Sequence, residues 1–256
     1  MKMTRLILLS AFLTLTLPLT LLVANAEPEA AGCQHMLSAF DGDDVRMGFG
    51  ASHTQNGTIE RVRDPADVNN QVARFWTGMK SSRVAKAHLI HRFAPIGAGG
   101  VVDMSGVFYF SKSDQTNSVI LMDLECASCG LDTNPGVRLY LRDGRLRVDR
   151  SKIGIDVPFY SEQDHQVEPG RWHDVRWRVH LGEGDAGRSD VFLNGQMVSS
   201  NRATTLLTQT IVSRLANIKI REAVDRFQIG ITANSNKTGT SLLLDDVRFC
   251  STQGAP

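Results

Sequence analysis

The sequence predicts an all-β protein built as a two-sheet antiparallel jelly-roll β-sandwich. Three observations support this fold class. From about residue 83 onward, apolar and polar residues alternate with the period of two that is typical of strands, and segments with helical periodicity are scarce. Turn residues separate these runs at short intervals. Strands do not alternate with helices, so a parallel α/β sheet is not expected.

Two strand pairs are predicted to form tight hairpins. One spans residues 137–149 with Asp143-Gly144 at its tip, and the other spans residues 190–198 with Asn194-Gly195 at its tip. Both dipeptides accept the positive φ angles of a type I′ turn, which suits a two-residue connection between antiparallel strands. The turns therefore also indicate which residues of the paired strands lie opposite each other.

The remaining strands are predicted from alternation alone. They are expected at residues 87–93, 106–110, 118–124, 171–180, 227–233 and 242–249. Residues 27–80 are less regular, with edge strands expected near residues 47–52 and 72–76. Residues 204–215 fit either a pair of strands or one short helix.

The first 26 residues have the organisation of a secretory signal peptide. Lys2 and Arg5 precede an apolar run that ends in Ala24-Asn25-Ala26, a small-x-small cleavage motif. Cleavage there leaves residues 27–256 as a single exported domain, periplasmic or extracellular, without a segment long enough to span a membrane. A retained membrane anchor is the alternative, and a poor lipoprotein motif before Cys33 leaves a lipid-anchored form open.

The charge balance excludes a globally basic nucleic-acid-binding protein. The complete chain has 28 Lys+Arg and 27 Asp+Glu, a formal net charge of +1. Removal of Lys2 and Arg5 with the signal peptide leaves 26 basic against 27 acidic residues, a net charge of −1. We therefore expect no nucleic-acid partner.

The four cysteines are expected to form two disulfides in an oxidising compartment. Three pairings are possible, and we favour Cys33 with Cys250 and Cys126 with Cys129. Cys126 follows a predicted strand and Gly130 begins a turn after the second cysteine, whereas a redox Cys-x-x-Cys normally opens a helix. The Cys126–Cys129 pair is therefore interpreted as a structural clip.

The hairpin of residues 137–149 concentrates arginines on one face. Its two-residue turn places three pairs opposite each other, namely Arg138 with Asp149, Tyr140 with Arg147, and Arg142 with Arg145. The residues between them are apolar and face the core. Like charges directly opposite each other destabilise a strand pair, so a compensating partner is expected.

Two kinds of partner would offset this repulsion. An acidic ligand would bind the guanidinium groups in bidentate fashion, with Tyr140 stacked on a sugar ring. Alternatively, acidic side chains on adjacent strands would pair with the arginines, such as Asp123, Glu125 and Asp174.

Several motifs resemble a known superfamily. The run Gly170-Arg-Trp-His-Asp-Val175 followed by Val191-Phe-Leu-Asn-Gly-Gln-Met-Val198 resembles laminin-G-like modules and the concanavalin A-like lectin/glucanase superfamily. Residues 135–148 and 244–247 look more like its polysaccharide-lyase branch, the heparin-lyase-like jelly rolls. The resemblance covers roughly residues 83–250 and implies a concave sheet face that holds a carbohydrate chain.

The resemblance also implies which residues a lyase would use. Lyases of this branch carry a Gln or Asn, a His and a Tyr on the concave face, and the strand before Pro135 typically offers Gln-x-His. This chain has Met122-Asp-Leu-Glu-Cys126 there instead. If the chain is a lyase, arginines of the hairpin would neutralise a uronate carboxylate, and the candidate bases are Tyr140, His88 and Tyr109.

Two further chemistries match parts of the sequence. Asp123 and Glu125 share one face of a predicted strand, as the carboxylates of a glycosidase do. The related glucanases use Glu-x-Asp-x-Glu, and here Leu121 occupies the position of the nucleophile. Asp245 and Asp246 are candidate ligands of a structural calcium ion, although they match no complete calcium loop. No other cofactor is expected.

These observations predict an exported protein that binds an acidic polysaccharide. The residues expected to bind it are Arg138, Tyr140, Arg142, Arg145, Arg147, Asp123 and Glu125. One alternative is a polysaccharide lyase that acts on a uronate-containing polysaccharide by β-elimination. The other is a cell-envelope or matrix module that binds a protein.

Overall fold

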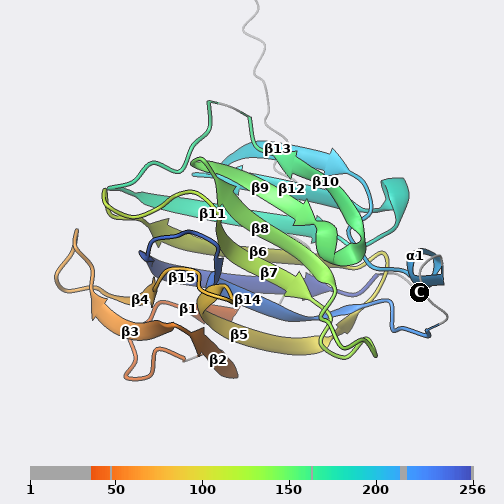
Figure 1. Ribbon diagram of the computed structural model, residues 1–256, viewed down its shortest axis with the longest axis horizontal. Coiled ribbons are helices and arrows are strands. Elements are labelled where there is room, and N and C mark those ends of the chain that lie inside the picture. The colour runs from red at the N-terminus through yellow and green to blue at the C-terminus, as the bar shows by residue number, and fades with distance from the viewer. Residues whose placement is uncertain (1–35, 47, 163, 214–217, 255–256) are drawn as a thin grey trace, which may run out of the picture. The chain divides into compact units, whose positions relative to one another are not determined.

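Two antiparallel β-sheets lie one behind the other in the computed structural model (Figure 1). The structure describes residues 36–46, 48–162, 164–213 and 218–254. The predicted signal peptide and Cys33 lie outside the described residues, so the signal peptide and the Cys33–Cys250 disulfide remain predictions. Within the described ranges, no helix is long and apolar enough to cross a membrane.

The first sheet contains eight strands within the described residues, in the order β13-β12-β11-β6-β15-β4-β3, with β1 paired to β15. Its strands are β1 (Met36–Ser38), β3 (Gly57–Arg63), β4 (Gln71–Thr77), β6 (Val101–Tyr109), β11 (Trp172–His180), β12 (Arg188–Leu193), β13 (Gln196–Arg202) and β15 (Thr240–Thr252).

The second sheet contains seven strands of the described chain, in the order β10-β9-β8-β7-β14-β5-β2. Its strands are β2 (Ala51–Gln55), β5 (Ala85–Ile96), β7 (Val119–Glu125), β8 (Gly136–Arg142), β9 (Arg145–Arg150), β10 (Ile155–Tyr160) and β14 (Val224–Asn234). The predicted antiparallel sandwich is therefore confirmed.

The core fills the space between the two sheets. Alternate residues of each strand point inward, as the strand geometry requires. The largest fully buried side chains come from both sheets and include Phe75, Phe108, Trp177 and Phe227. Each large apolar side chain removed from water contributes about 1.5–3 kcal/mol, so this layer stabilises the contact between the sheets.

The two predicted hairpin turns are confirmed. Asp143 and Gly144 have φ angles of 53° and 74°, and Asn194 and Gly195 have φ angles of 52° and 80°. Both pairs occupy the left-handed region that a type I′ turn requires. Consequently β8 pairs with β9 in the predicted register.

Most predicted strands are present, but the N-terminal part differs from the prediction. The strand predicted as an edge near residues 72–76 is β4, which lies inside its sheet because β3 covers it. The chain passes from β2 in one sheet to β3 in the other through Asn56 and Gly57. A Cβ on Gly57 would lie 2.6 Å from the carbonyl oxygen of Trp76 and 2.7 Å from that of Lys86, so only glycine fits there.

Three short helices connect the strands of the described chain: η1 (Ser151–Ile153), η2 (Gly184–Ala186) and α1 (Gln209–Ser213). Helix α1 settles the open alternative for residues 204–215 in favour of a short helix.

The Cys126–Cys129 disulfide is present and lies in a loop, as predicted. The Asp225 carboxylate accepts hydrogen bonds from the backbone N–H of Ala127 at 2.6 Å and of Ser128 at 3.1 Å. These bonds attach the loop after β7 to the beginning of β14. The clip is therefore structural, since no helix follows it.

Candidate functional site

The solvent-facing side of the second sheet carries most of the chain's candidate functional residues. We call this surface the polar face. Register and side-chain contacts place fourteen residues on it: His53, His88, Asp123, Glu125, Arg138, Tyr140, Arg142, Arg145, Arg147, Asp149, Tyr160, Arg226, Gln228 and Thr232.

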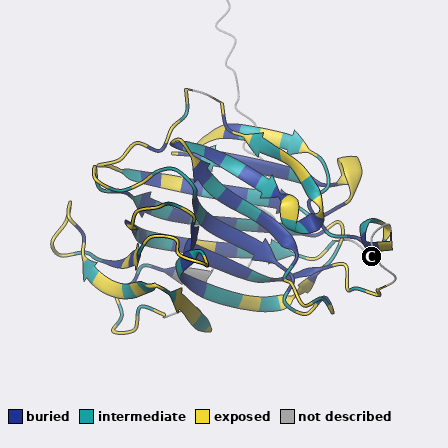
Figure 2. Cartoon of the chain, in the orientation of Figure 1, coloured by how far each residue is buried: buried dark blue, intermediate teal, exposed yellow. Residues whose placement is uncertain are grey.

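The middle of the polar face is buried although it points away from the core. His88, Asp123, Glu125 and Gln228 are only 2%, 5%, 2% and 6% exposed, and we call these four residues the polar floor. Strands β7 and β14, which carry three of them, are almost entirely buried in Figure 2. Burying polar groups costs free energy unless they are hydrogen-bonded.

Two atoms of the polar floor have no hydrogen-bond partner among the described residues. They are Nδ1 of His88 and Oδ1 of Asp123. Native proteins pair most buried polar atoms, so such exceptions are informative. Strain, a catalytic role, or a bound water or ion accounts for such atoms in native proteins.

Glu125 forms the ionic centre of the floor. Its carboxylate pairs with Lys152 of η1 and with Arg226 of β14, and it accepts a hydrogen bond from Nε2 of Gln228 at 2.5 Å. The prediction that Glu125 would pair with hairpin arginines is therefore wrong. Arg226 pairs with Glu125 in place of a hairpin arginine, because Arg226 lies directly opposite Glu125 in the register of β14 and β7.

Two histidines lie side by side at the β5–β2 edge of the polar face. The ring centroids of His53 and His88 are 5.3 Å apart, and His53 is exposed. Burial lowers the pKa of His88 to about 3, assisted by the charges of His53, Lys86 and Arg226. Burial, with Lys86 and Arg226, also lowers the pKa of His53. Both rings are therefore neutral near pH 7 and carry a lone pair.

Asp123 is a buried acid of the floor whose pKa is raised. Burial raises its pKa to about 6, and the neighbouring Glu125 adds to the shift. Asp123 and Glu125 share one face, as predicted, but Glu125 is fully engaged by its ion pairs and lacks the freedom of a glycosidase carboxylate.

The arginine hairpin has internal partners. Arg138 Nη2 lies 2.7 Å from Asp149 Oδ1, directly across the strands. The Arg147 guanidinium lies 4.8 Å from the ring centroid of Tyr140 and 5.0 Å from that of Tyr160, and its Nη1 donates to the Tyr160 hydroxyl at 2.9 Å. Stacking and this ion pair offset the repulsion between the arginines.

Of the acidic partners expected on other strands, Glu125 and Asp174 do not fill this role, whereas Asp123 lies opposite Arg138 in the register of β7 and β8. Asp174 lies on β11 of the first sheet, so it cannot reach the hairpin. Within the described part of the chain, the ion pairs of the hairpin arginines use Asp149 and Asp143, both from the hairpin itself.

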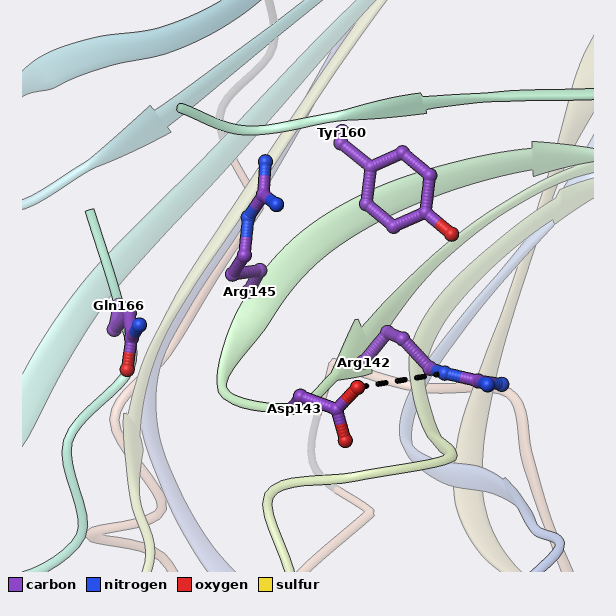
Figure 3. A pocket seen from close by; sticks show the side chains of 5 residues that line it. All are labelled: Arg142, Asp143, Arg145, Tyr160 and Gln166. Carbon is purple, nitrogen blue, oxygen red and sulfur yellow. Dashed lines mark ion pairs between the residues drawn. The ribbon is translucent and has the colours of Figure 1, made fainter. Parts of the chain in front are cut away.

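A pocket of about 570 Å³ opens at the turn of the hairpin (Figure 3). It is lined by Arg142, Asp143, Arg145, Tyr160 and Gln166. Arg142 Nε lies 3.6 Å from Asp143 Oδ2, and about half of the Arg142 side chain is exposed. The Arg145 guanidinium lies 5.3 Å from the Tyr160 ring centroid and donates to the carbonyl of Ser161. The pocket is cationic and has an aromatic wall.

The sequence that builds both sheets matches a known protein family. A model of the polysaccharide lyase family matches residues 51–248, more than half of the chain. The chain belongs to the polysaccharide lyase family. None of the curated proteins compared with it matches.

Solved structures support the same fold for this family member. An endo-β-1,4-glucuronan lyase from the fungus Trichoderma reesei has a TM-score of 0.62 at 14% identity, covering 86% of this chain and 95% of its own. The alginate lyase Aly36B has a TM-score of 0.56 at 8% identity, covering 87% and 98%. The cellulose-induced protein Cip1 has a TM-score of 0.50 at 13% identity, covering 87% and 94%. The predicted two-sheet jelly-roll fold is confirmed.

The polysaccharide lyase resemblance implied a Gln, a His and a Tyr on one sheet face. The polar face holds all three residue types, but β7 supplies none of them. Gln228 comes from β14, His88 from β5 and Tyr140 from β8. Strand β7, which carries Asp123 and Glu125, lies between β8 and β14 in the sheet.

Other predicted site residues lie elsewhere in this lyase-family fold. Tyr109 belongs to β6 of the first sheet, where its ring centroid is 5.4 Å from that of Trp172. It therefore lies on a different sheet from the other two candidate bases, His88 and Tyr140, and its role as a base stays a prediction. The alternation of β6 is correct, but residue periodicity does not indicate which sheet a strand joins.

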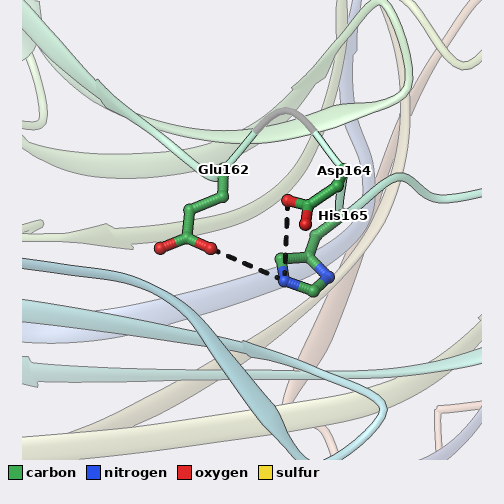
Figure 4. A group of neighbouring side chains, drawn as sticks. All are labelled: Glu162, Asp164 and His165. Carbon is green, nitrogen blue, oxygen red and sulfur yellow. Dashed lines mark ion pairs between the residues drawn. The ribbon is translucent and has the colours of Figure 1, made fainter.

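The candidate calcium ligands Asp245 and Asp246 lie on β15 of the first sheet. Asp245 accepts a hydrogen bond from Asn70 Nδ2 at 2.9 Å, and burial raises its pKa. Within the described residues, the one group of three His, Cys, Asp or Glu side chains with close ligand atoms is Glu162, Asp164 and His165 (Figure 4). Calcium at Asp245 and Asp246 remains a prediction.

Sequence reasoning missed His53, Lys152, Arg226 and Gln228. His53 lies in the irregular N-terminal part, where alternation is weak. Arg226 and Gln228 alternate with the core residues of β14, so their outward direction was readable. Their position beside Glu125 was not, because Gln228 and Glu125 are 103 residues apart in the sequence.

Proposed function

We propose that this protein is a lyase that cleaves a uronate-containing polysaccharide by β-elimination on its polar face. Membership of the polysaccharide lyase family supports the reaction class. A glucuronan lyase and an alginate lyase among its structural neighbours support a polyuronate substrate. The observation that carries the proposal is the polar floor, where His88, beside the exposed His53, and Asp123 each keep a buried atom unpaired.

β-Elimination at a uronate needs three groups. A positive charge or hydrogen-bond donor must neutralise the carboxylate so that the proton on C5 becomes acidic. A base takes that proton, and its electron pair forms the C4–C5 double bond while the C4–O4 bond breaks. An acid gives a proton to the departing O4 oxygen. The polar face offers each of these groups.

Arginines of the hairpin are suited to the carboxylate. Arg142 is about half exposed and lines the pocket, so its guanidinium is available to a ligand. Arg147 is held in position by Tyr140 and Tyr160. A planar guanidinium binds a carboxylate through two parallel hydrogen bonds, which gives both charge neutralisation and orientation.

The histidine pair and Tyr140 are suited to proton transfer. The lowered pKa of His53 and of His88 keeps both rings neutral, which a base requires. Burial raises the pKa of Tyr140, so its hydroxyl keeps the proton that an acid must donate. Two strands separate β5 from β8, which places their backbones roughly 14 Å apart and leaves space for a sugar between the side chains.

Incubation with acidic polysaccharides tests the proposal. The protein is mixed separately with glucuronan, alginate and a heparin-like glycan, and the ultraviolet absorbance of the unsaturated uronate is followed. We expect turnover of at least one substrate. Tyr140→Phe should lower kcat by roughly 100-fold, the scale of general acid–base catalysis. Tyr109→Phe makes the same change on the other sheet and should leave kcat unchanged.

Two outcomes would contradict the proposal. Binding of an acidic glycan without any absorbance change would reject the lyase and favour the binding protein that the sequence predicts. Equal effects of Tyr140→Phe and Tyr109→Phe would remove the polar face as the site of reaction.

A further inference from the structure

Two histidines on adjacent strands of the second sheet lie directly opposite each other. In the register of β2 and β5, the partner of His53 is His88. Opposite residues of an antiparallel pair have Cβ atoms about 4.5–5.5 Å apart on one side of the sheet. The ring centroids are 5.3 Å apart and the ring planes are inclined by 36°, so the rings do not stack face to face. The backbone therefore holds the two imidazoles at a short, fixed separation.

This separation matches that of two histidines bound to one metal ion. A zinc–nitrogen bond of about 2.1 Å, with about 1.1 Å more from the nitrogen to the ring centre, places each centroid roughly 3.2 Å from the ion. At the tetrahedral angle of about 109°, the two centroids then lie about 5.2 Å apart. The observed distance between the centroids of His53 and His88 is 5.3 Å. Coordination therefore requires rotation of the side chains but no displacement of the strands.

The pair has an unused nitrogen for an ion. Nδ1 of His88 has no hydrogen-bond partner among the described residues, although His88 is only 2% exposed. An unpaired polar atom at this depth costs free energy, which a bound ion would recover. His53 lies on the edge strand β2 and is exposed, so its ring can rotate to admit an ion to the buried ring.

The surrounding charges limit the affinity of this pair for a cation but do not abolish it. Lys86 and Arg226 act on both rings with positive charge. Arg226 is paired with Glu125, which offsets its charge. Lys86 is partly exposed, and its long side chain can turn its ammonium group into solvent.

The ligand type determines which ion fits. Imidazole suits zinc, copper and nickel, whereas calcium and magnesium take oxygen ligands. Among the described residues, the one group of three close His, Cys, Asp or Glu side chains is that of Glu162, Asp164 and His165, so the pair is a site with two protein ligands. Water or a substrate oxygen would fill the remaining positions around the ion.

We propose that His53 and His88 form a binding site for a divalent transition-metal ion such as Zn²⁺. The ion takes a nitrogen lone pair of each ring. Occupancy also regulates the proposed function, because a ring nitrogen bound to metal cannot accept a proton, so zinc inhibits the lyase. Only this inhibition rests on the proposed function, whereas the binding of the ion does not.

Titration of the full chain, free of any affinity tag, with zinc chloride tests the site. Calorimetry is performed at about pH 7.5, where an imidazole with the ordinary pKa of about 6.5 is mostly neutral. We expect the tightest zinc to bind with one equivalent per chain. His53→Asn changes an exposed side chain and should weaken this zinc by roughly 10-fold or more. His165→Asn is the matched control, since it alters another possible metal group and should leave the tightest zinc in place.

Copper provides a second measurement on the same variants. The electron paramagnetic resonance spectrum of bound Cu²⁺ is split by each coordinated nitrogen. We expect two nitrogens in the wild type and in His165→Asn, and at most one in His53→Asn. Thermal unfolding without metal identifies a variant that fails to fold. If His53→Asn does so, the wild-type and His165→Asn spectra decide the matter, because the site requires two nitrogens in both.

The proposal is overturned if folded His53→Asn keeps the tightest zinc, if folded His165→Asn loses it, or if copper in the wild type is bound by fewer than two nitrogens. Zinc binding at the pair without lyase activity of the metal-free protein would reject the proposed function alone. Lyase activity without zinc binding would reject the metal site alone. An active lyase that binds zinc at the pair and is not inhibited would reject the regulatory role.

Discussion

Replacing Glu125 by glutamine removes the negative charge from the polar floor while preserving the size of the side chain. The side chains of Glu125, Arg226 and Lys152 are 3%, 13% and 30% exposed. Lys152 can turn toward solvent, whereas Arg226 stays buried with an unpaired charge. Loss of one partner from a buried ion pair costs about 3–5 kcal/mol, and the partial exposure of Arg226 places our expectation near ~3 kcal/mol.

Denaturant and thermal unfolding measure this loss. For a domain of this size, ~3 kcal/mol corresponds to a decrease in Tm of about 6–12 °C. The matched control is Glu60→Gln, whose pair with Arg74 is nearly half exposed on both sides and should contribute no more than about 1 kcal/mol. The double variant Glu125→Gln/Arg226→Met should recover much of the stability, because no unpaired charge then remains.

The reasoning would be refuted by equal destabilisation in Glu125→Gln and Glu60→Gln. It would also be refuted if adding Arg226→Met to Glu125→Gln lowered stability further, because the cost would then lie in lost packing rather than in an unpaired charge.

Two other predictions follow from the same surface. Arg142→Ser should raise KM for an acidic polysaccharide several-fold and weaken the salt dependence of binding. The control is Arg46→Ser, which removes an exposed arginine that is paired with Asp44. It should change neither KM nor the salt dependence. Titration of stability should show opposite contributions from two floor residues. The pKa of His88 is lowered from 6.5 to about 3, so unfolding takes up a proton and the free energy of unfolding falls as pH drops from 6.5 toward 3. The pKa of Asp123 is raised from 3.8 to about 6, so its contribution falls as pH rises across that interval. His88→Gln should remove the change in unfolding free energy between pH 6.5 and about 3, and Asp123→Asn should remove the change between pH 3.8 and about 6. An unchanged pH dependence in either variant would contradict the assignment for that residue.

Local features of the site were predictable from the sequence. The Asp143-Gly144 turn has only two residues, so it determined the pairing of Arg138 with Asp149 and of Tyr140 with Arg147. Alternation then separated the core side of the hairpin from its polar side. These inferences depend only on residues close in sequence, which is why the structure agrees with them.

Non-local features were not predictable in the same way. The arginines use Asp149, whereas Glu125 uses Arg226, which lies 101 residues away. The alternation of apolar and polar residues indicates that a side chain points away from the core, but it does not indicate which strand pairs with the strand that carries it. For the same reason Tyr109 and Tyr140 looked equivalent in sequence, although their strands belong to different sheets.

The departure of residues 122–126 from the lyase pattern has a physical interpretation in the sheet. Neighbouring strands lie about 4.8 Å apart, so a side chain on β14 or β5 reaches the same region as one on β7. Here β14 supplies Gln228 and β5 supplies His88, while β7 supplies the acid that accepts a hydrogen bond from Gln228. The Gln and His that the resemblance implies on β7 are thus present on the same face of the sheet, but they come from β14 and β5.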